Sequence, residues 1–172
     1  MAYYADLSTY AYRDGEPSSL NVGWLDGEHE FARGTPNDEL VDALWEHCAV
    51  LVSPLRGIHS CELCPRLRQS ALPVTRARVT RKLGFAEIRV FDVDREVVYA
   101  APNLVLHYVT RHRYDPPAGF KEAIQRLRPP SPGYMERLRS LGVRFWDDHT
   151  INGRSRPVPP TGRSPGPGGA GR

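Results

Sequence analysis

The chain has 172 residues, of which 40% are apolar and 25% charged, a composition typical of a globular domain and not of a disordered, fibrous or membrane protein. A chain of this length can bury one modest core. The net charge is +3, and Lys82 and Lys121 are the only lysines among 23 basic residues. Arginine bias with abundant proline and glycine can reflect GC-rich coding as readily as nucleic-acid binding. The charge is therefore weak evidence for any function.

Two features of the sequence predict a cytoplasmic protein without a membrane partner. No stretch approaches the roughly 18 apolar residues of a membrane span, and the N-terminus lacks the basic start and apolar region of a signal peptide. The three cysteines are an odd number, and two of them lie only three positions apart. That pattern does not fit a secreted disulfide framework and fits a reduced metal-binding pair better.

Residues 1–25 carry several aromatics, and a turn at 14–17 predicts two short extended pieces that form a hairpin. Thr35 as N-cap and Pro36 at the first position predict a helix over about 36–48. Its apolar spacing places Cys48 on the buried face and His47 in solvent.

The pair Cys61 and Cys64 is the sharpest chemical feature of the sequence. Its spacing suits a metal knuckle, in which a tight turn points both thiolates at one ion while backbone N–H groups bond the sulfurs. A His-x-x-x-x-His pair, His107 and His112, lies some forty residues downstream. The four residues together predict a Cys₂His₂ zinc site.

Two alternatives to this ligand set remain open. A redox Cys-x-x-Cys usually begins a helix, but Pro65 and a basic stretch follow here without an amphipathic pattern. On a regular helix, residues five apart are separated by about 500° of rotation, so His107 and His112 would point about 140° apart. His59, two residues before Cys61, is therefore a substitute ligand.

Residues 66–82 are rich in arginine and show little apolar periodicity. One hypothesis is a phosphate-contacting loop beside the knuckle. No aromatic residue is interleaved with the basic ones, as stacking on bases would require. We therefore expect a solvated, mobile loop.

The second half of the chain alternates strand and helix patterns. Residues 85–100 predict a β-hairpin with Glu87 on its solvated face. Helices are expected over 103–112, with Asn103 as N-cap, and then over 118–128 and 133–141. A small terminal strand or a docking segment is expected at 143–146.

The predicted fold class is α+β, with a small antiparallel sheet made from the N-terminal strands and the 85–100 hairpin, and three or four short helices against it. Residues 1–150 are expected to form a single domain. Residues 151–172 are rich in proline, glycine and arginine, and they are expected to be a disordered tail.

The chain also resembles a family of small uncharacterised actinobacterial (Streptomyces-type) proteins. The resemblance covers about residues 1–130 and implies a compact domain from a GC-rich bacterium without implying a mechanism. It is carried by four stretches of sequence: Tyr3-Tyr4-Ala5-Asp6-Leu7-Ser8, Leu20-Asn21-Val22-Gly23-Trp24-Leu25-Asp26, the Arg56-Gly57-x-His59-x-Cys61-x-x-Cys64 knuckle, and Tyr99-Ala100-Ala101-Pro102-Asn103-Leu104 through His107-Tyr108-Val109 to Tyr114-x-Pro116-Pro117.

The leading functional hypothesis is a non-catalytic interaction module with one structural zinc ion. Four protein ligands would close the coordination sphere and leave no place for a substrate. The expected partner is another protein, with nucleic acid as a weaker candidate.

Two other functions are left open. In a metal-dependent hydrolase or nuclease, three of the five candidate ligands would hold the ion, Glu87 or Asp115 would be the base, and Arg56 or Arg111 would stabilise an anion. The absence of an acidic pair weakens this hypothesis. In the third hypothesis the cysteines are core or redox thiols, and the module binds its partner without metal.

Overall fold

The computed structural model describes residues 3–11, 18–53, 58–64 and 71–147, so the expected C-terminal tail lies outside the described residues. None of the described helices is long and apolar enough to cross a bilayer. In chain order the elements are β1 (Thr9–Tyr10), β2 (Ser19–Asn21), α1 (Asp38–His47), β3 (Val50–Val52), β4 (Leu72–Arg76), β5 (Val79–Leu83), β6 (Glu87–Asp92), β7 (Val97–Pro102), α2 (Val105–His112), α3 (Ala118–Arg126), α4 (Pro132–Ser140) and β8 (Phe145–Asp147).

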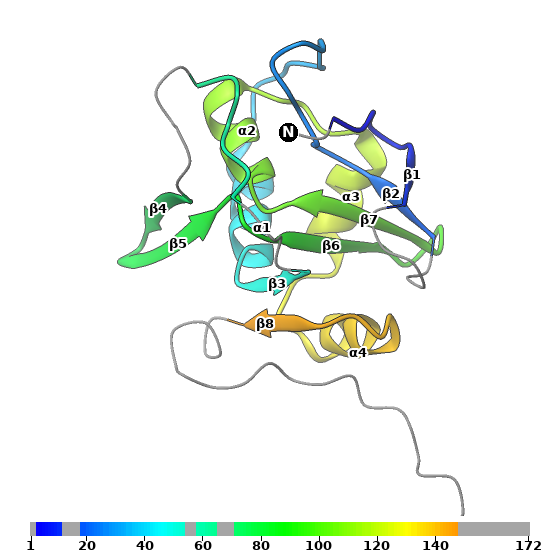
Figure 1. Ribbon diagram of the computed structural model, residues 1–172. Helices are drawn as coiled ribbons and strands as arrows, with labels where there is room; N and C mark the ends of the chain where they lie inside the picture. Colours follow the sequence, from blue (N-terminus) through cyan, green and yellow to red (C-terminus); the bar gives the residue numbers. More distant parts are fainter. Residues whose placement is uncertain (1–2, 12–17, 54–57, 65–70, 148–172) are drawn as a thin grey trace, which may run out of the picture.

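The centre of the fold is a six-stranded sheet in the order β1-β2-β7-β6-β3-β8 (Figure 1). The predicted 85–100 hairpin forms its middle, because β6 and β7 pair antiparallel along their whole length. The N-terminal hairpin joins the sheet through β2, which runs parallel to β7 and continues the pairing with a bond from Val22 N–H to Ala100 O of 3.1 Å. The α+β class is thus confirmed, but the sheet is mixed and not antiparallel as expected.

Helices α1, α2 and α3 cover one face of this sheet (Figure 1). Side chains alternate across a strand, so Ile88 and Val90 of β6 point to the helices while Glu87 and Arg89 point to the other face. Cys48 is buried in the same core, as its spacing predicts. Helix α1 begins two residues later than expected, because the side chain of Asn37 caps it by accepting a hydrogen bond from Leu40 N–H.

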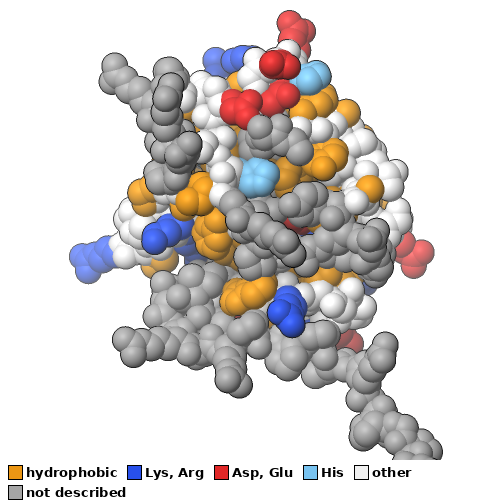
Figure 2. Space-filling model, viewed as in Figure 1, with side chains coloured by type: hydrophobic (Ala, Val, Ile, Leu, Met, Phe, Trp, Pro, Cys, Tyr) orange, Lys and Arg blue, Asp and Glu red, His pale blue; other side chains and the backbone are white. Residues whose placement is uncertain are grey.

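A separate hairpin, β4–β5, occupies much of the stretch 66–82 for which a mobile loop was expected, so that expectation is wrong for residues 72–82. Residues 66–70 lie outside the described residues. Its turn residues Ala77 and Arg78 both have positive φ, 46° and 67°, in place of the Asn or Gly usual in such turns. An aromatic residue does accompany the basic stretch, because Arg81 stacks over the ring of Trp45 at 4.1 Å. In the face shown in Figure 2, basic side chains lie beside this hairpin, and acidic ones gather elsewhere.

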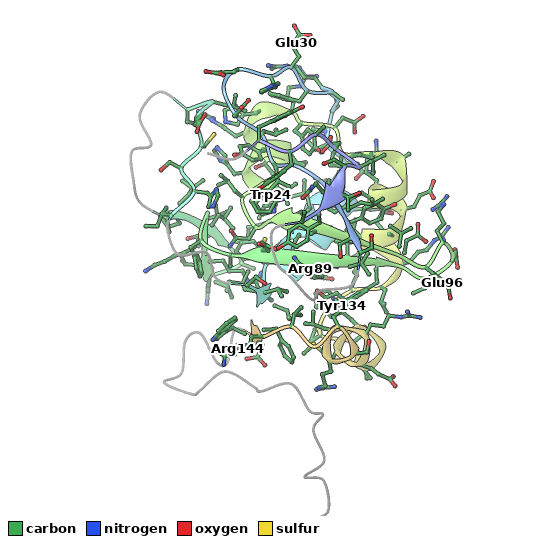
Figure 3. The ribbon with its side chains drawn as sticks, turned by 45° about the vertical axis from the view of Figure 1, so that its right-hand side comes forward. Trp24, Glu30, Arg89, Glu96, Tyr134 and Arg144 are labelled. Atoms are coloured by element: carbon green, nitrogen blue, oxygen red, sulfur yellow. The ribbon has the colours of Figure 1, made fainter. Side chains whose placement is uncertain are left out.

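Helix α4 covers the other face of the sheet near β3 and β8, where Tyr134 packs against Phe91 with ring centroids 5.3 Å apart. The Tyr134 hydroxyl donates to Arg89 O at 2.9 Å, and Figure 3 shows the two residues close together. His47, at the end of α1, packs edge-on against the same tyrosine and is fully buried, so its expected place in solvent is wrong. Burial lowers the pKa of His47 to about 4.

The base of the β4–β5 hairpin is fixed by Asn103, which the sequence predicts to be a helix cap. Its side chain instead accepts from Gly84 N–H at 2.7 Å and donates to Lys82 O at 3.1 Å, while Leu104 occupies the cap position without a side-chain bond. Gly84 has φ +91°, and a Cβ there would lie 2.3 Å from His59 O. The chain therefore requires glycine where the hairpin, the start of α2 and the loop before Cys61 meet.

Replacing Gly84 by alanine tests this junction. The change combines a positive φ with a backbone clash, so the free energy of unfolding should fall by about 3 kcal/mol. Gly142→Ala is the control, because φ is +69° there but nothing lies within 4 Å of the added Cβ. Its loss should be about 1 kcal/mol. Equal losses in urea unfolding would show that the contact with His59 is unimportant.

Burial of His47 predicts a pH dependence of stability. The folded pKa lies below the unfolded value of 6.5, so the unfolded chain binds a proton first as the pH falls. The wild type should lose up to about 3 kcal/mol between pH 6.5 and pH 4 from this group alone. Urea unfolding of His47→Gln, measured over the same range, should lack that component. Parallel curves for the two proteins would contradict the assignment.

Candidate metal centre

The first half of the site is a loop, residues 58–64, that contains no helix or strand. It is held to the hairpin base by a bond from His59 N–H to Gly84 O. The Cys61–Cys64 turn closes with Cys64 N–H donating to Cys61 O at 3.4 Å. Burial raises the pKa of the Cys61 thiol, and hydrogen bonds from the backbone N–H groups of Leu63 and Cys64 to its sulfur offset only part of that effect.

The second half of the site is helix α2, which carries His107 in its first turn and His112 as its last residue. The helix stops there because Arg113 takes a left-handed conformation, with φ 59° and ψ 29°, and its N–H donates to Tyr108 O. Both imidazoles approach each other through Nε2, the ring nitrogen farther from the backbone, and these atoms are 3.2 Å apart. The long side chains thus close the angular gap that five-residue spacing leaves on a helix.

Four ligand atoms, from Cys61, Cys64, His107 and His112, lie within 4.8 Å of one another. His112 Nε2 is 3.2 Å from each sulfur, and His107 Nε2 is 3.4 Å from the Cys64 sulfur. In a tetrahedral zinc site with sulfur and nitrogen ligands, the atoms are separated by about 3.3 to 3.8 Å. The group could therefore hold a metal ion such as zinc after a small relaxation.

The neutral form of the imidazoles favours metal binding, whereas a thiol of the group must release its proton first. Burial, with additional effects of His112 and Arg111, lowers the pKa of His107 to about 4, so this imidazole is neutral at physiological pH. Burial also lowers the pKa of His112. Burial and the neighbouring Cys64 raise the pKa of Cys61 to about 12. A metal ion would have to displace the Cys61 proton, which makes affinity increase with pH.

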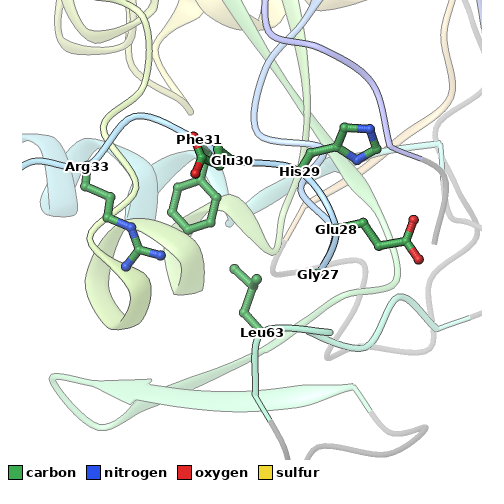
Figure 4. A pocket seen from close by; sticks show the side chains of 7 residues that line it. All are labelled: Gly27, Glu28, His29, Glu30, Phe31, Arg33 and Leu63. Atoms are coloured by element: carbon green, nitrogen blue, oxygen red, sulfur yellow. The ribbon is translucent and has the colours of Figure 1, made fainter.

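The surroundings of the site are partly buried. Tyr108 lies between the two histidines on α2, and its hydroxyl donates to Leu25 O at 3.3 Å, which joins α2 to the segment after β2. Beside the knuckle is an open hollow of about 470 Å³, lined by residues 27–31, Arg33 and Leu63 (Figure 4). Phe31 and Leu63 supply its apolar side chains, and Leu63 comes from between the two cysteines.

His59, the substitute ligand, lies outside the four-residue group. Its ring packs edge-on against Trp24, with centroids 5.8 Å apart. Burial lowers its pKa as well. The structure thus brings together four of the five candidate ligands and places His59 against an aromatic ring.

The candidate catalytic acids have other partners. Glu87 is fully buried and not solvated as expected. It accepts hydrogen bonds from the Tyr10 hydroxyl at 2.9 Å and from Arg89 at 2.6 Å, on the sheet face opposite α2. Asp115 forms an ion pair with Lys121 at 2.7 Å.

The Tyr10–Glu87–Arg89 network was missed from the sequence. A signal for it existed, because Glu87 and Arg89 are two residues apart in a strand and therefore share a face. Nothing near them in the sequence identifies Tyr10 as the third member.

The model of a family described as a domain of unknown function (DUF7919) matches residues 2–125, a span that contains all four residues of the metal group. Searches of curated proteins and of solved structures returned no match.

The choice between the histidines is directly testable. His112→Ala removes an atom that lies 3.2 Å from both sulfurs, so the purified variant should retain much less zinc than the wild type. His59→Ala should retain as much zinc as the wild type, although it loses the contact with Trp24. Elemental analysis after gel filtration measures both. Zinc loss on His59→Ala but not on His112→Ala would reverse the ligand assignment.

Proposed function

Because the chain belongs to the DUF7919 family, whose function is unknown, we propose a function from the chemistry of its own residues: a non-catalytic binding module stabilised by one structural zinc ion. The observation that carries this proposal is the convergence of two sulfurs and two imidazole nitrogens within 4.8 Å. Thiolate and imidazole are the ligands typical of structural zinc sites.

A closed set of four protein ligands favours a structural role over a catalytic one. A catalytic zinc ion usually keeps one position for water or substrate, and here the four side chains would fill all positions. A hydrolase would also need a base near the bound water. Glu87 lies on the opposite sheet face, and Asp115 pairs with Lys121. The open-site alternative therefore has less support.

The proposed ion would act on stability by linking distant segments. Cys61 and Cys64 lie in a loop without secondary structure, and the histidines lie more than forty residues later on α2. Zinc binding to such sites contributes about 10–16 kcal/mol at neutral pH, and in a small domain much of it appears as folding stability. The chain has only a modest core, so this contribution would be large relative to a typical stability of about 5–15 kcal/mol.

Metal analysis combined with thermal melts tests the proposal. The purified protein should contain about one zinc ion per chain, and a strong chelator should lower its melting temperature sharply. Cobalt substitution should give the absorption typical of a tetrahedral thiolate site.

Cysteine variants provide the matched control. Cys61→Ser should lose both the zinc ion and the effect of the chelator on melting. Cys48→Ser makes the same chemical change at a buried cysteine outside the group, so it should keep both. A wild-type protein that is free of metal and equally stable with chelator would disprove structural zinc and leave the cysteines as core or redox thiols.

A further inference from the structure

The β4–β5 hairpin is a two-stranded sheet separate from the main one, and it extends from the body of the domain (Figure 1). Two sets of contacts fix its position. Asn103 binds its base through Gly84 and Lys82. Arg81 stacks on Trp45 of α1 and also donates to Trp45 O at 2.8 Å. The hairpin is thus a protruding element with a defined orientation.

The outward face of the hairpin is polar and basic. Alternation along the strands and the pairing of Thr75 with Thr80 put Thr75, Thr80 and Lys82 on one exposed face. The two threonine hydroxyls are 2.8 Å apart. Arg78 is exposed at the tip. This face presents donors that could reach phosphate oxygens from both strands and from the turn.

The arginines of the hairpin divide into two groups. Arg76 pairs with Asp42 at 2.6 Å, and Arg81 covers Trp45, so both contribute to holding the hairpin on α1. Arg78 and Lys82 are exposed, and the stretch 71–86 contains no acidic residue. Asp42, which pairs with Arg76, lies on α1, and Arg76 is on the face opposite Thr75, Thr80 and Lys82. The outward face therefore carries positive charge.

The tip has a backbone conformation that its residues do not favour. Ala77 and Arg78 both have positive φ, where a side chain costs free energy and glycine does not. Strain of this kind is often retained at functional positions. These two residues form the turn of the hairpin, so Arg78 lies at its tip.

We propose that the outward face of the β4–β5 hairpin binds the phosphate backbone of duplex DNA. A two-stranded β-ribbon fits the major groove of B-form DNA, whereas the deep, narrow groove of A-form RNA excludes such an element. Single strands are usually bound by stacking on exposed aromatics, but Trp45 is covered by Arg81. The inference rests on the proposed binding module and names its partner class.

The interaction is measured by fluorescence anisotropy. A labelled DNA duplex of about 20 base pairs is titrated with the full zinc-loaded chain. We expect a sequence-independent dissociation constant of about 10⁻⁴–10⁻⁶ M that weakens steeply with salt. Arg78→Ala with Lys82→Ala removes two phosphate contacts, so the slope of log K against log salt should become shallower by about 1.8. Duplex RNA, single-stranded DNA and heparin should bind more weakly than duplex DNA.

Two matched pairs separate the hairpin from overall charge. Arg137→Ala with Arg139→Ala removes two exposed arginines from α4. Arg154→Ala with Arg156→Ala removes two arginines of the C-terminal sequence, outside the described residues. Both control variants should bind DNA like the wild type. The proposal is overturned if the wild type does not bind DNA, or if it binds RNA or heparin as tightly as DNA. It is also overturned if the hairpin pair loses no DNA affinity, or if all three pairs lose the same amount.

Glycine substitutions at the tip provide a second signature. Ala77→Gly and Arg78→Gly both relieve a positive φ, so each should raise the melting temperature by about 2–4 °C. Only Arg78→Gly also removes a charge, so it alone should weaken DNA binding. Weakening by both, or by neither, would overturn the role of Arg78.

Zinc content is measured on the same samples, which keeps the two proposals distinguishable. A protein that holds zinc but does not bind DNA retains the structural site and overturns the hairpin proposal. A metal-free, folded protein that binds DNA through Arg78 and Lys82 overturns structural zinc and retains the hairpin surface.

Discussion

Two thiols and two imidazoles meet in one small volume, and they connect the loop 58–64 with helix α2. No other local sequence pattern predicts contact between these two segments. Residues 58–64 have no helix or strand of their own, and their described backbone contacts run to the turn itself and to Gly84. Helix α2 supplies the other two side chains and is held in the core by its apolar face. The order of the knuckle therefore depends on side chains from a helix that is already fixed by the sheet.

The sheet provides this fixed support because its two faces are used differently. One face packs three helices over an apolar core. The other face contains a buried ion pair, Glu87 and Arg89, which Tyr10 completes through its hydroxyl and its ring. Buried ion pairs give little net stability but are costly to break, so this network favours one arrangement of the N-terminal hairpin against β6.

Much of the architecture could be predicted from local signals in the sequence. Alternation identified β6 and β7, helical spacing identified four helices, and the Cys-x-x-Cys and His-x-x-x-x-His spacings selected the four residues that the structure brings together. Cap positions shifted because Asn37, and not Thr35, caps α1, and because the Asn103 side chain bonds Gly84 and Lys82 and does not cap α2.

The features that were missed depend on contacts distant in sequence or on unfavourable local chemistry. The β4–β5 turn has no glycine or asparagine, so no turn signal marked it. The parallel pairing of β2 with β7 has no local signature. His47 and Glu87 are polar residues whose burial depends on Tyr134 and Tyr10, far away in the chain.

The attachment of the β4–β5 hairpin has a consequence for how such a domain can diversify. Its position is set at the base by Asn103, which bonds the backbone of Gly84 and Lys82, and on the inner side by Trp45, and these contacts use no outward side chain. Residues on the outer face can therefore be exchanged without disturbing the core. The hairpin is a place where recognition can change during evolution, or be changed by design, while the rest of the domain stays the same.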